Sequence, residues 1–118
     1  MKYLFLLYDR PEGESPEPGS DEWMETLGAY QAADAAMVEA GVMIDCAPLQ
    51  SVETATTVRI RNGETLLTDG PAAEIKEQLG GYALVDCANL DEALKWAATI
   101  PAVLHGSVEV RPILEIPS

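Results

Sequence analysis

The residues best suited to chemistry in this sequence are a pair and a loop cluster. Tyr30 and Asp34 are four residues apart in a segment of helical periodicity, so both side chains are expected on one helix face. That face is otherwise apolar, and burial disfavours a charged carboxylate and raises its pKa. A carboxyl group with a raised pKa is suited to act as a general acid or base. The structural alternative is that Asp34 only accepts a hydrogen bond from a backbone N–H, from Tyr30 or from an arginine.

The loop cluster lies in the stretch TDGPAAEIKEQLGG, residues 68–81. Asp69, Glu74 and Lys76 would bind a ligand if this loop covered a cleft, the carboxylates accepting from donor groups and the lysine facing an anion. The same stretch also suits a rigid connector. Its Asp-Gly-Pro sequence is typical of a turn, and residues 71–79 would then form a short helical turn that stops at the glycines 80 and 81.

Arg111 completes the candidate site. An arginine on the inward face of a strand would bind an anionic ligand or pair with Asp34 or Glu109, and a surface salt bridge is the alternative. The expected cleft is therefore lined by Tyr30, Asp34, Asp69, Glu74, Lys76 and Arg111. Within it, Asp34 or Asp69 is the candidate acid or base.

Several common active-site patterns are missing from the sequence. There is no phosphate-binding loop, dinucleotide fingerprint, nucleophile elbow or calcium loop. His105 is the single histidine, and Cys46 and Cys87 are far apart, which argues against a histidine-based triad and a metal site. We therefore expect no cofactor and no metal. The two cysteines are expected to be buried reduced thiols, since a disulfide would require adjacent strands.

Length and charge predict one acidic domain. The chain has 118 residues, 47% of them hydrophobic, and a formal net charge of -13. Nucleic acid and anionic lipid are unsuitable partners because they are negatively charged as well. The first apolar run stops at Tyr8 without a signal-peptide cleavage site, and no segment has the roughly 20 apolar residues that cross a bilayer. A cytoplasmic location is expected.

The elements that must position the candidate residues can be predicted from periodicity and turn residues. A helix is expected from Asp21, capped by Ser20 or Asp21, to Gly41, and a second from Asn89 to before Pro101. Asn62-Gly63 predicts a hairpin. Strands are expected over 2–8, 42–49, 56–60, 64–68, 82–86 and 107–111, and an acidic loop over 9–20. This order predicts a ferredoxin-like α+β fold with an inserted β-hairpin.

The strands over 2–8 and 82–86 are apolar on both faces, whereas the two helices can cover only one face of the sheet. Leaving the second face in water would cost several kcal/mol at about 25 cal/mol per Å². A second copy of the sheet would cover it, which predicts a homodimer. The alternative cover is the hairpin or the acidic loop folding back.

The motifs of residues 56–112 also resemble a known family. The hairpin, D-G-P, K-E-Q-L-G-G, L-D-E-A-L-K-W-A and V-E-V-R-P follow in order, and with MKYLFLLYD they make nearly the whole chain resemble the YCII-related proteins, in the branch named for its D-G-P-F motif. Ala72 stands at the motif's phenylalanine. The resemblance implies a dimeric α/β-barrel type of ferredoxin-like fold.

The resemblance implies little about activity, and two functions stay open. In a more distant branch a histidine and an aspartate have been suggested as a catalytic pair, but the matching positions here hold Tyr30 and Ile100, which argues against that chemistry. The leading hypothesis is a small dimeric protein whose cleft binds a small molecule of unknown identity, with cofactor-independent acid/base activity. The alternative is a non-enzymatic accessory or regulatory module with a protein partner, because relatives in this branch are often encoded near extracytoplasmic-function sigma factors.

Overall fold

The computed structural model of the chain describes residues 1–11, 13–73 and 75–117. Within them the elements follow in the order β1 (Lys2–Asp9), α1 (Asp21–Glu39), β2 (Met43–Pro48), the 3-10 helix η1 (Val52–Thr54), β3 (Thr56–Arg61), β4 (Glu64–Asp69), β5 (Gln78–Asp86), α2 (Leu90–Ala97), α3 (Ala102–His105) and β6 (Ser107–Pro112). This is the predicted order, with two short helical segments in addition.

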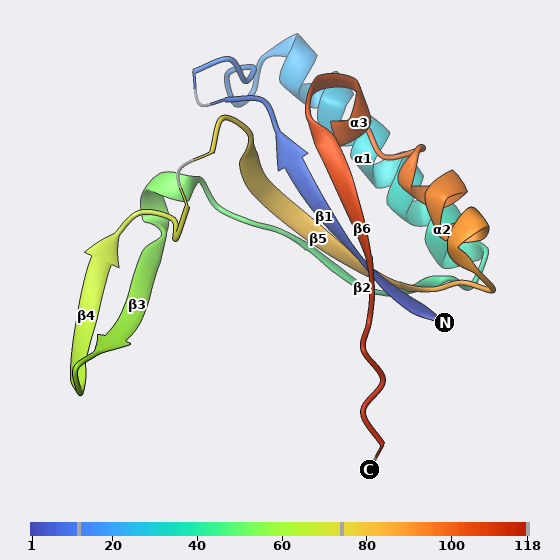
Figure 1. The fold of residues 1–118 in the computed structure, drawn as a ribbon. Helices are drawn as coiled ribbons and strands as arrows, with labels where there is room; N and C mark the ends of the chain where they lie inside the picture. The colour runs from blue at the N-terminus through green and yellow to red at the C-terminus, as the bar shows by residue number, and fades with distance from the viewer. Residues whose placement is uncertain (12, 74, 118) are drawn as a thin grey trace.

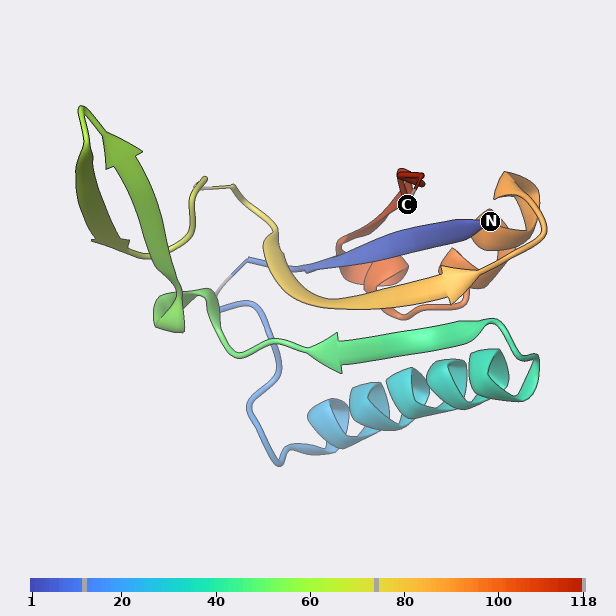
Figure 2. The same ribbon diagram turned by 90° about the horizontal axis from the view of Figure 1, so that it is seen from below.

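The main sheet has the strand order β2-β5-β1-β6, and β1 pairs antiparallel with both β5 and β6. The helices lie together on one side of this sheet (Figure 1). This arrangement confirms the predicted ferredoxin-like α+β fold. The inserted hairpin forms a separate two-stranded sheet, β3-β4, which stands away from the body (Figures 1 and 2).

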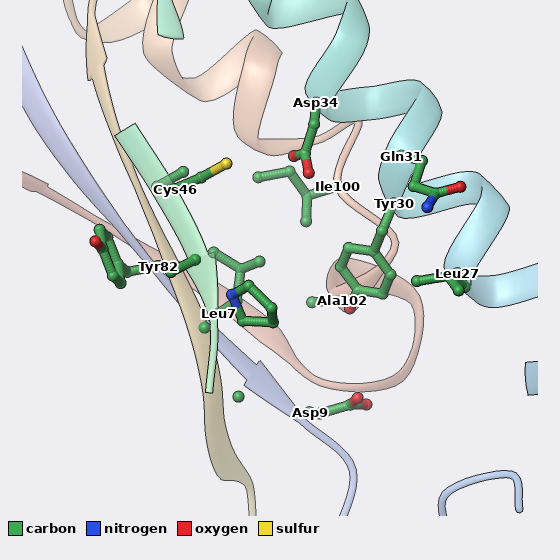
Figure 3. Close-up of a pocket in the computed structure, with 15 residues that line it drawn as sticks. Leu7, Asp9, Leu27, Tyr30, Gln31, Asp34, Cys46, Tyr82, Ile100 and Ala102 are labelled. Atoms are coloured by element: carbon green, nitrogen blue, oxygen red, sulfur yellow. The ribbon is translucent and has the colours of Figure 1, made fainter. Parts of the chain in front are cut away.

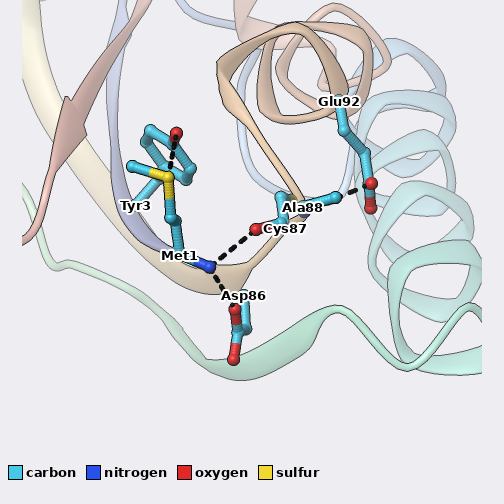
Figure 4. Close-up of polar contacts among 6 residues, drawn as sticks. All are labelled: Met1, Tyr3, Asp86, Cys87, Ala88 and Glu92. Atoms are coloured by element: carbon cyan, nitrogen blue, oxygen red, sulfur yellow. Dashed lines mark hydrogen bonds and ion pairs between the residues drawn. The ribbon is translucent and has the colours of Figure 1, made fainter.

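Local signals place both long helices where the sequence predicted them. Ser20 caps α1, since its side chain accepts from the backbone N–H of Trp23 at 3.2 Å, and Gly41 follows the helix with a φ of 76°. Asn89 caps α2 by accepting from the N–H of Glu92 at 2.9 Å. The carboxylate of Glu92 reaches back to the N–H of Ala88 at 3.3 Å (Figure 4), a variant of the capping box.

The core lies between the helices and one face of the sheet. Tyr3, Phe5 and Val85 project from β1 and β5 against Met37 of α1, and all four are almost completely buried. The amino group of Met1 ties the start of β1 to the end of β5, because it donates to the Asp86 carboxylate at 3.0 Å and to the Cys87 carbonyl at 2.8 Å (Figure 4).

The opposite face of the sheet carries the alternate side chains of the same strands. Leu4 and Leu6 are paired with Leu84 and Tyr82 across β1 and β5, and these side chains are only half-buried. The hairpin stands away from the sheet (Figure 1), so the alternative in which it folds back over this face is wrong.

The hairpin itself is built as the sequence predicted. Asn62 and Gly63 adopt φ values of 53° and 78°, which the tight turn requires, and Val58 pairs with Leu67. Its root is closed by two hydrogen bonds: the N–H of Gly70 donates to the Ala55 carbonyl at 2.8 Å, and the Thr57 hydroxyl to the Gly70 carbonyl at 2.7 Å.

The short helical turn expected over 71–79 is wrong for the described residues of that range. β5 begins at Gln78, four residues before the predicted strand, and the two glycines lie inside it. The physical reason is close packing of backbones: a Cβ on Gly81 would lie 3.0 Å from the Ala47 carbonyl oxygen of β2. The glycines permit strand pairing there and do not end a helix.

Candidate functional site

A cavity of about 380 Å³ lies between α1, the sheet and the segment that follows α2 (Figure 3). Its walls come from three parts of the chain. The helix contributes Leu27, Tyr30, Gln31 and Asp34, the segment after α2 contributes Ile100 and Ala102, and the strands contribute Leu7, Asp9, Cys46, Ala47, Pro48, Gly80, Gly81, Tyr82 and Ala83.

Small residues leave this space open. Gly80 and Gly81 have no side chain, and Ala83 and Ala102 have only a methyl group, so the walls opposite α1 are shallow. One helical turn further along α1, Met37 fills the equivalent space and is completely buried. The cavity therefore lies at the end of the core, where the large apolar side chains stop.

Asp34 points from α1 into the space between the helix and the sheet (Figure 3). Desolvation by the surrounding apolar walls raises the pKa of its carboxyl group. No residue in the described part of the chain donates a hydrogen bond to this carboxylate, so the structural alternative for Asp34 finds no donor there. A half-buried carboxyl group without a protein partner is available to a ligand.

Tyr30 is directed into the same cavity (Figure 3). Desolvation and then the charge of Asp9 raise the pKa of its phenol to about 12, although the positive charge of Arg10 acts in the opposite direction. A phenol with so high a pKa keeps its proton at neutral pH. Tyr30 is therefore a hydrogen-bond donor to an occupant of the cavity.

The two cysteines differ from each other. Cys87 is buried as predicted, but Cys46 is exposed and lines the cavity, so the prediction of a buried thiol is wrong for Cys46. The reason is its place on β2, the edge strand, next to the open space. Partial desolvation of the sulfur beside the cavity wall, followed by the charges of Asp34 and Asp45, raises the pKa of the Cys46 thiol.

The remaining predicted site residues are not brought into this cavity. Asp69 ends β4 at the root of the hairpin and is exposed, as is Lys76. Arg111 lies on the uncovered face of the sheet, where its guanidinium pairs with the carboxylate of Glu109. This is the surface salt bridge that the sequence offered as the alternative to ligand binding. Glu74 lies outside the described residues. The structure brings together only Tyr30 and Asp34 from the predicted cleft.

Asp9 was not among the predicted site residues. The signal that could have found it is the alternation along β1, because Tyr3, Phe5, Leu7 and Asp9 are spaced by two and face the helices. Tyr82 lines the cavity differently, because its ring lies on the far side of β2 and β5 (Figure 3), where its hydroxyl donates to Asp45 at 2.9 Å.

The charge of the cavity wall is negative. Asp9 and Asp34 are the acidic members, and no lysine, arginine or histidine lines the cavity among the residues that the structure describes. In residues 1–11, 13–73 and 75–117, no three His, Cys, Asp or Glu side chains are grouped as a metal site would require.

No helix in the described ranges is long and apolar enough to span a membrane.

Comparison with known proteins identifies the family. A family model of the YCII-related domain matches residues 1–117. The chain belongs to the YCII-related family. An uncharacterised protein of Rhizobium meliloti (strain 1021) is 39% identical to this YCII-related chain over 115 residues, which are 96% of this chain and 92% of the relative.

A solved structure has the same fold as this YCII-related protein. It is the 5-chloro-2-hydroxyhydroquinone dehydrochlorinase of Burkholderia phenoliruptrix AC1100 in complex with 2,5-dihydroxybenzoquinone, with a TM-score of 0.52 and 17% sequence identity. The match covers 97% of this chain and 94% of that chain.

The environment of Asp34 predicts a measurable effect of pH on stability. Because its pKa is higher in the folded than in the unfolded protein, the folded state binds more protons between the two values, and wild-type stability falls as pH rises through that window. Asp34→Asn is expected to raise the free energy of unfolding at pH 7, because it removes the cost of holding a charged carboxylate in this apolar space. The gain should disappear below the ordinary pKa of 3.8. Urea unfolding at several pH values checks this, and an equal gain at every pH would contradict it.

Proposed function

We propose that the cavity binds an uncharged ring that carries hydroxyl groups and that Asp34 transfers a proton to or from it. The observation that carries this proposal is that Tyr30 and Asp34, one turn apart on α1, project into an apolar space whose described walls hold no basic side chain. An anion would meet two carboxylates in that space and no cation. The hydroxyl groups of a neutral molecule would instead donate hydrogen bonds to these two carboxylates.

The size and walls of the cavity support this ligand class. About 380 Å³ lies at the lower end of the range of ligand pockets, which suits a single ring with small substituents. Leu7, Leu27, Ile100 and Ala102 offer the apolar contacts that such a ring needs. The dehydrochlorinase that shares the fold was solved with a hydroxylated six-membered ring, which makes this class a reasonable first probe.

The two side chains would divide the chemistry between them. Desolvation makes the ionised Asp34 carboxylate a stronger base than an ordinary aspartate, so it would accept the proton of a ligand hydroxyl. Tyr30 keeps its own proton and would donate a hydrogen bond to the ligand oxygen as negative charge develops there. The proton moves from the ligand oxygen to Asp34, and no cofactor takes part in this step.

The positions of Tyr30 and Ile100 bear on this proposal. The sequence resemblance matched them to the histidine and the aspartate of a more distant branch of the family, and both residues line the cavity here. With a phenol and an isoleucine at these positions, Asp34 is the candidate base in their place.

Hydroquinone is the probe for a direct test by isothermal titration calorimetry. Asp34→Asn and Tyr30→Phe are each expected to weaken binding about tenfold, the scale of one hydrogen bond to a charged or polar group. Asp69→Asn is the matched control, because Asp69 is exposed at the root of the hairpin. The Asp69→Asn protein should bind hydroquinone as tightly as the wild type does.

The two cysteines locate the bound probe independently. Iodoacetamide should modify the exposed Cys46 and leave the buried Cys87 unmodified, and hydroquinone should slow the reaction at Cys46. If hydroquinone does not bind, or binds without protecting Cys46, the proposal fails. The regulatory binding module that the sequence offered as an alternative would then be the better hypothesis.

The uncovered face of the sheet supports a second part of the proposal, a homodimer. The helices cover only one face (Figure 1). Leu4, Leu6 and Leu84 remain half-buried on the other face. A second copy of the same sheet is a self-complementary cover for such a face. This assembly leaves the cavity accessible, because the cavity lies on the helix side.

A further inference from the structure

A second cavity of about 570 Å³ adjoins the first, on the side of the acidic loop and η1. The two cavities share Asp9, Leu27, Tyr30, Pro48 and Gly80 as walls. Tyr30 therefore lies at the boundary between the two spaces.

Arg10 lines the second cavity, and one edge of its guanidinium is only partly satisfied. Its side chain is only 19% exposed. Nη1 donates to the Glu14 carbonyl at 3.2 Å, whereas Nη2 forms an ion pair with the Glu22 carboxylate at 3.6 Å, longer than a normal hydrogen bond. Nε is buried and finds no acceptor among the described residues.

This partly satisfied Nε and Nη2 edge favours one kind of ligand group. The guanidinium is planar and permanently charged, and this edge presents two parallel N–H groups that match the two oxygens of a carboxylate. Asp9 does not fill this role, because its Oδ1 accepts from the backbone N–H of Arg10 at 2.7 Å. Asp9 and Glu22 lie nearby, which favours a singly charged carboxylate over a doubly charged phosphate.

We propose that Arg10 forms a carboxylate subsite, so that the full ligand is a hydroxylated ring joined by a short arm to a carboxylate. The ring occupies the first cavity beside Asp34, and the arm passes Tyr30 to reach the Nε and Nη2 edge of Arg10. This inference rests on the proposed function for the position of the ring and adds the class of the ligand.

Two probes that differ only in the acidic arm test the subsite. Hydroquinone carries the ring alone, and 2,5-dihydroxyphenylacetate carries the same ring with a carboxylate on one methylene. The wild-type protein is expected to bind the acid about tenfold more tightly than hydroquinone, measured by calorimetry at pH 7. Arg10→Gln should reduce this ratio to about twofold or less, and Arg10→Lys, a point charge without the planar edge, to an intermediate value.

Glu22→Gln is the matched control on the same guanidinium. It removes the distant carboxylate that competes for Nη2, so the preference for the acid should increase. The ratio of the two affinities in one folded sample reports on the subsite, and a circular dichroism spectrum confirms that each variant is folded. If hydroquinone binds the wild type but the acid binds no better, or if the preference survives Arg10→Gln, the carboxylate subsite is overturned and the ring site stands. If hydroquinone itself does not bind, both proposals are overturned.

Discussion

Gly106→Ala is expected to lower the free energy of unfolding by about 3 kcal/mol, one of the largest effects of any single substitution in this chain. Gly106 lies between α3 and β6, and its N–H donates to the Ala102 carbonyl at 2.7 Å. A Cβ here would collide with the Tyr8 carbonyl oxygen and lie 2.9 Å from the Tyr8 carbonyl carbon and 3.1 Å from the Asp9 Cα. These are backbone atoms of the central strand, which cannot rotate away.

The same substitution should also disturb the cavity, because the displaced segment includes Asp9, which lines it. Gly28→Ala is the matched control. Gly28 lies in α1 with no atom within 4 Å of its added Cβ, so alanine there should stabilise the protein by roughly 0.5 to 1 kcal/mol. Urea unfolding of both variants measures the difference, and a Gly106→Ala protein as stable as the wild type would contradict the tight contact between β1 and β6.

Leu6→Lys is expected to convert the proposed homodimer into monomers, weakening association at least about a hundredfold. Leu6 lies at the centre of the uncovered face, between Tyr82 of β5 and Glu109 of β6. In a monomer the lysine faces water and the Glu109 carboxylate, so the fold should tolerate it. In a dimer of facing sheets, the lysine and Glu109 would both be removed from water, and that desolvation would oppose association.

Analytical ultracentrifugation over a range of concentrations gives the association constant of each protein. Val58→Lys is the control, since Val58 is 60% exposed on the hairpin, away from the main sheet. It should leave the dimer intact if the sheets face each other. A wild-type protein that is monomeric at all concentrations would contradict the proposed homodimer. Loss of the dimer in Val58→Lys but not in Leu6→Lys would indicate that the interface lies on the hairpin.

The sequence predicted those features that short segments determine by themselves. Ser20 and Asn89 are caps because their side chains reach N–H groups three residues away, and Asn62-Gly63 is a turn because of its own backbone preferences. The pairing of Tyr30 with Asp34 is equally local, because a helix places them on one face. The fold class then followed from the order of the elements and the handedness of their connections.

The rest of the site depends on where segments distant in the sequence meet. The local sequence of one segment does not determine those contacts. Asp69 and Lys76 belong to a stretch whose hairpin turns away from the body, and the direction of that departure is not encoded in the turn residues. Gly80 and Gly81 fit two interpretations of the sequence, the end of a helix or a close approach of two backbones. The position of β2 beside Gly81 decides for the second. Asp9 and Arg10 were assigned to a loop, although they border two cavities.

The root of the hairpin has a consequence for the evolution of this protein. The chain leaves the body near Ala55 and returns at Gly70, and the bonds between these points close the excursion on itself. What lies beyond that stem is mechanically separate from the sheet and from both cavities. Relatives are thus free to lengthen, shorten or replace the projecting arm, acquiring new attachments without rebuilding the ligand pocket.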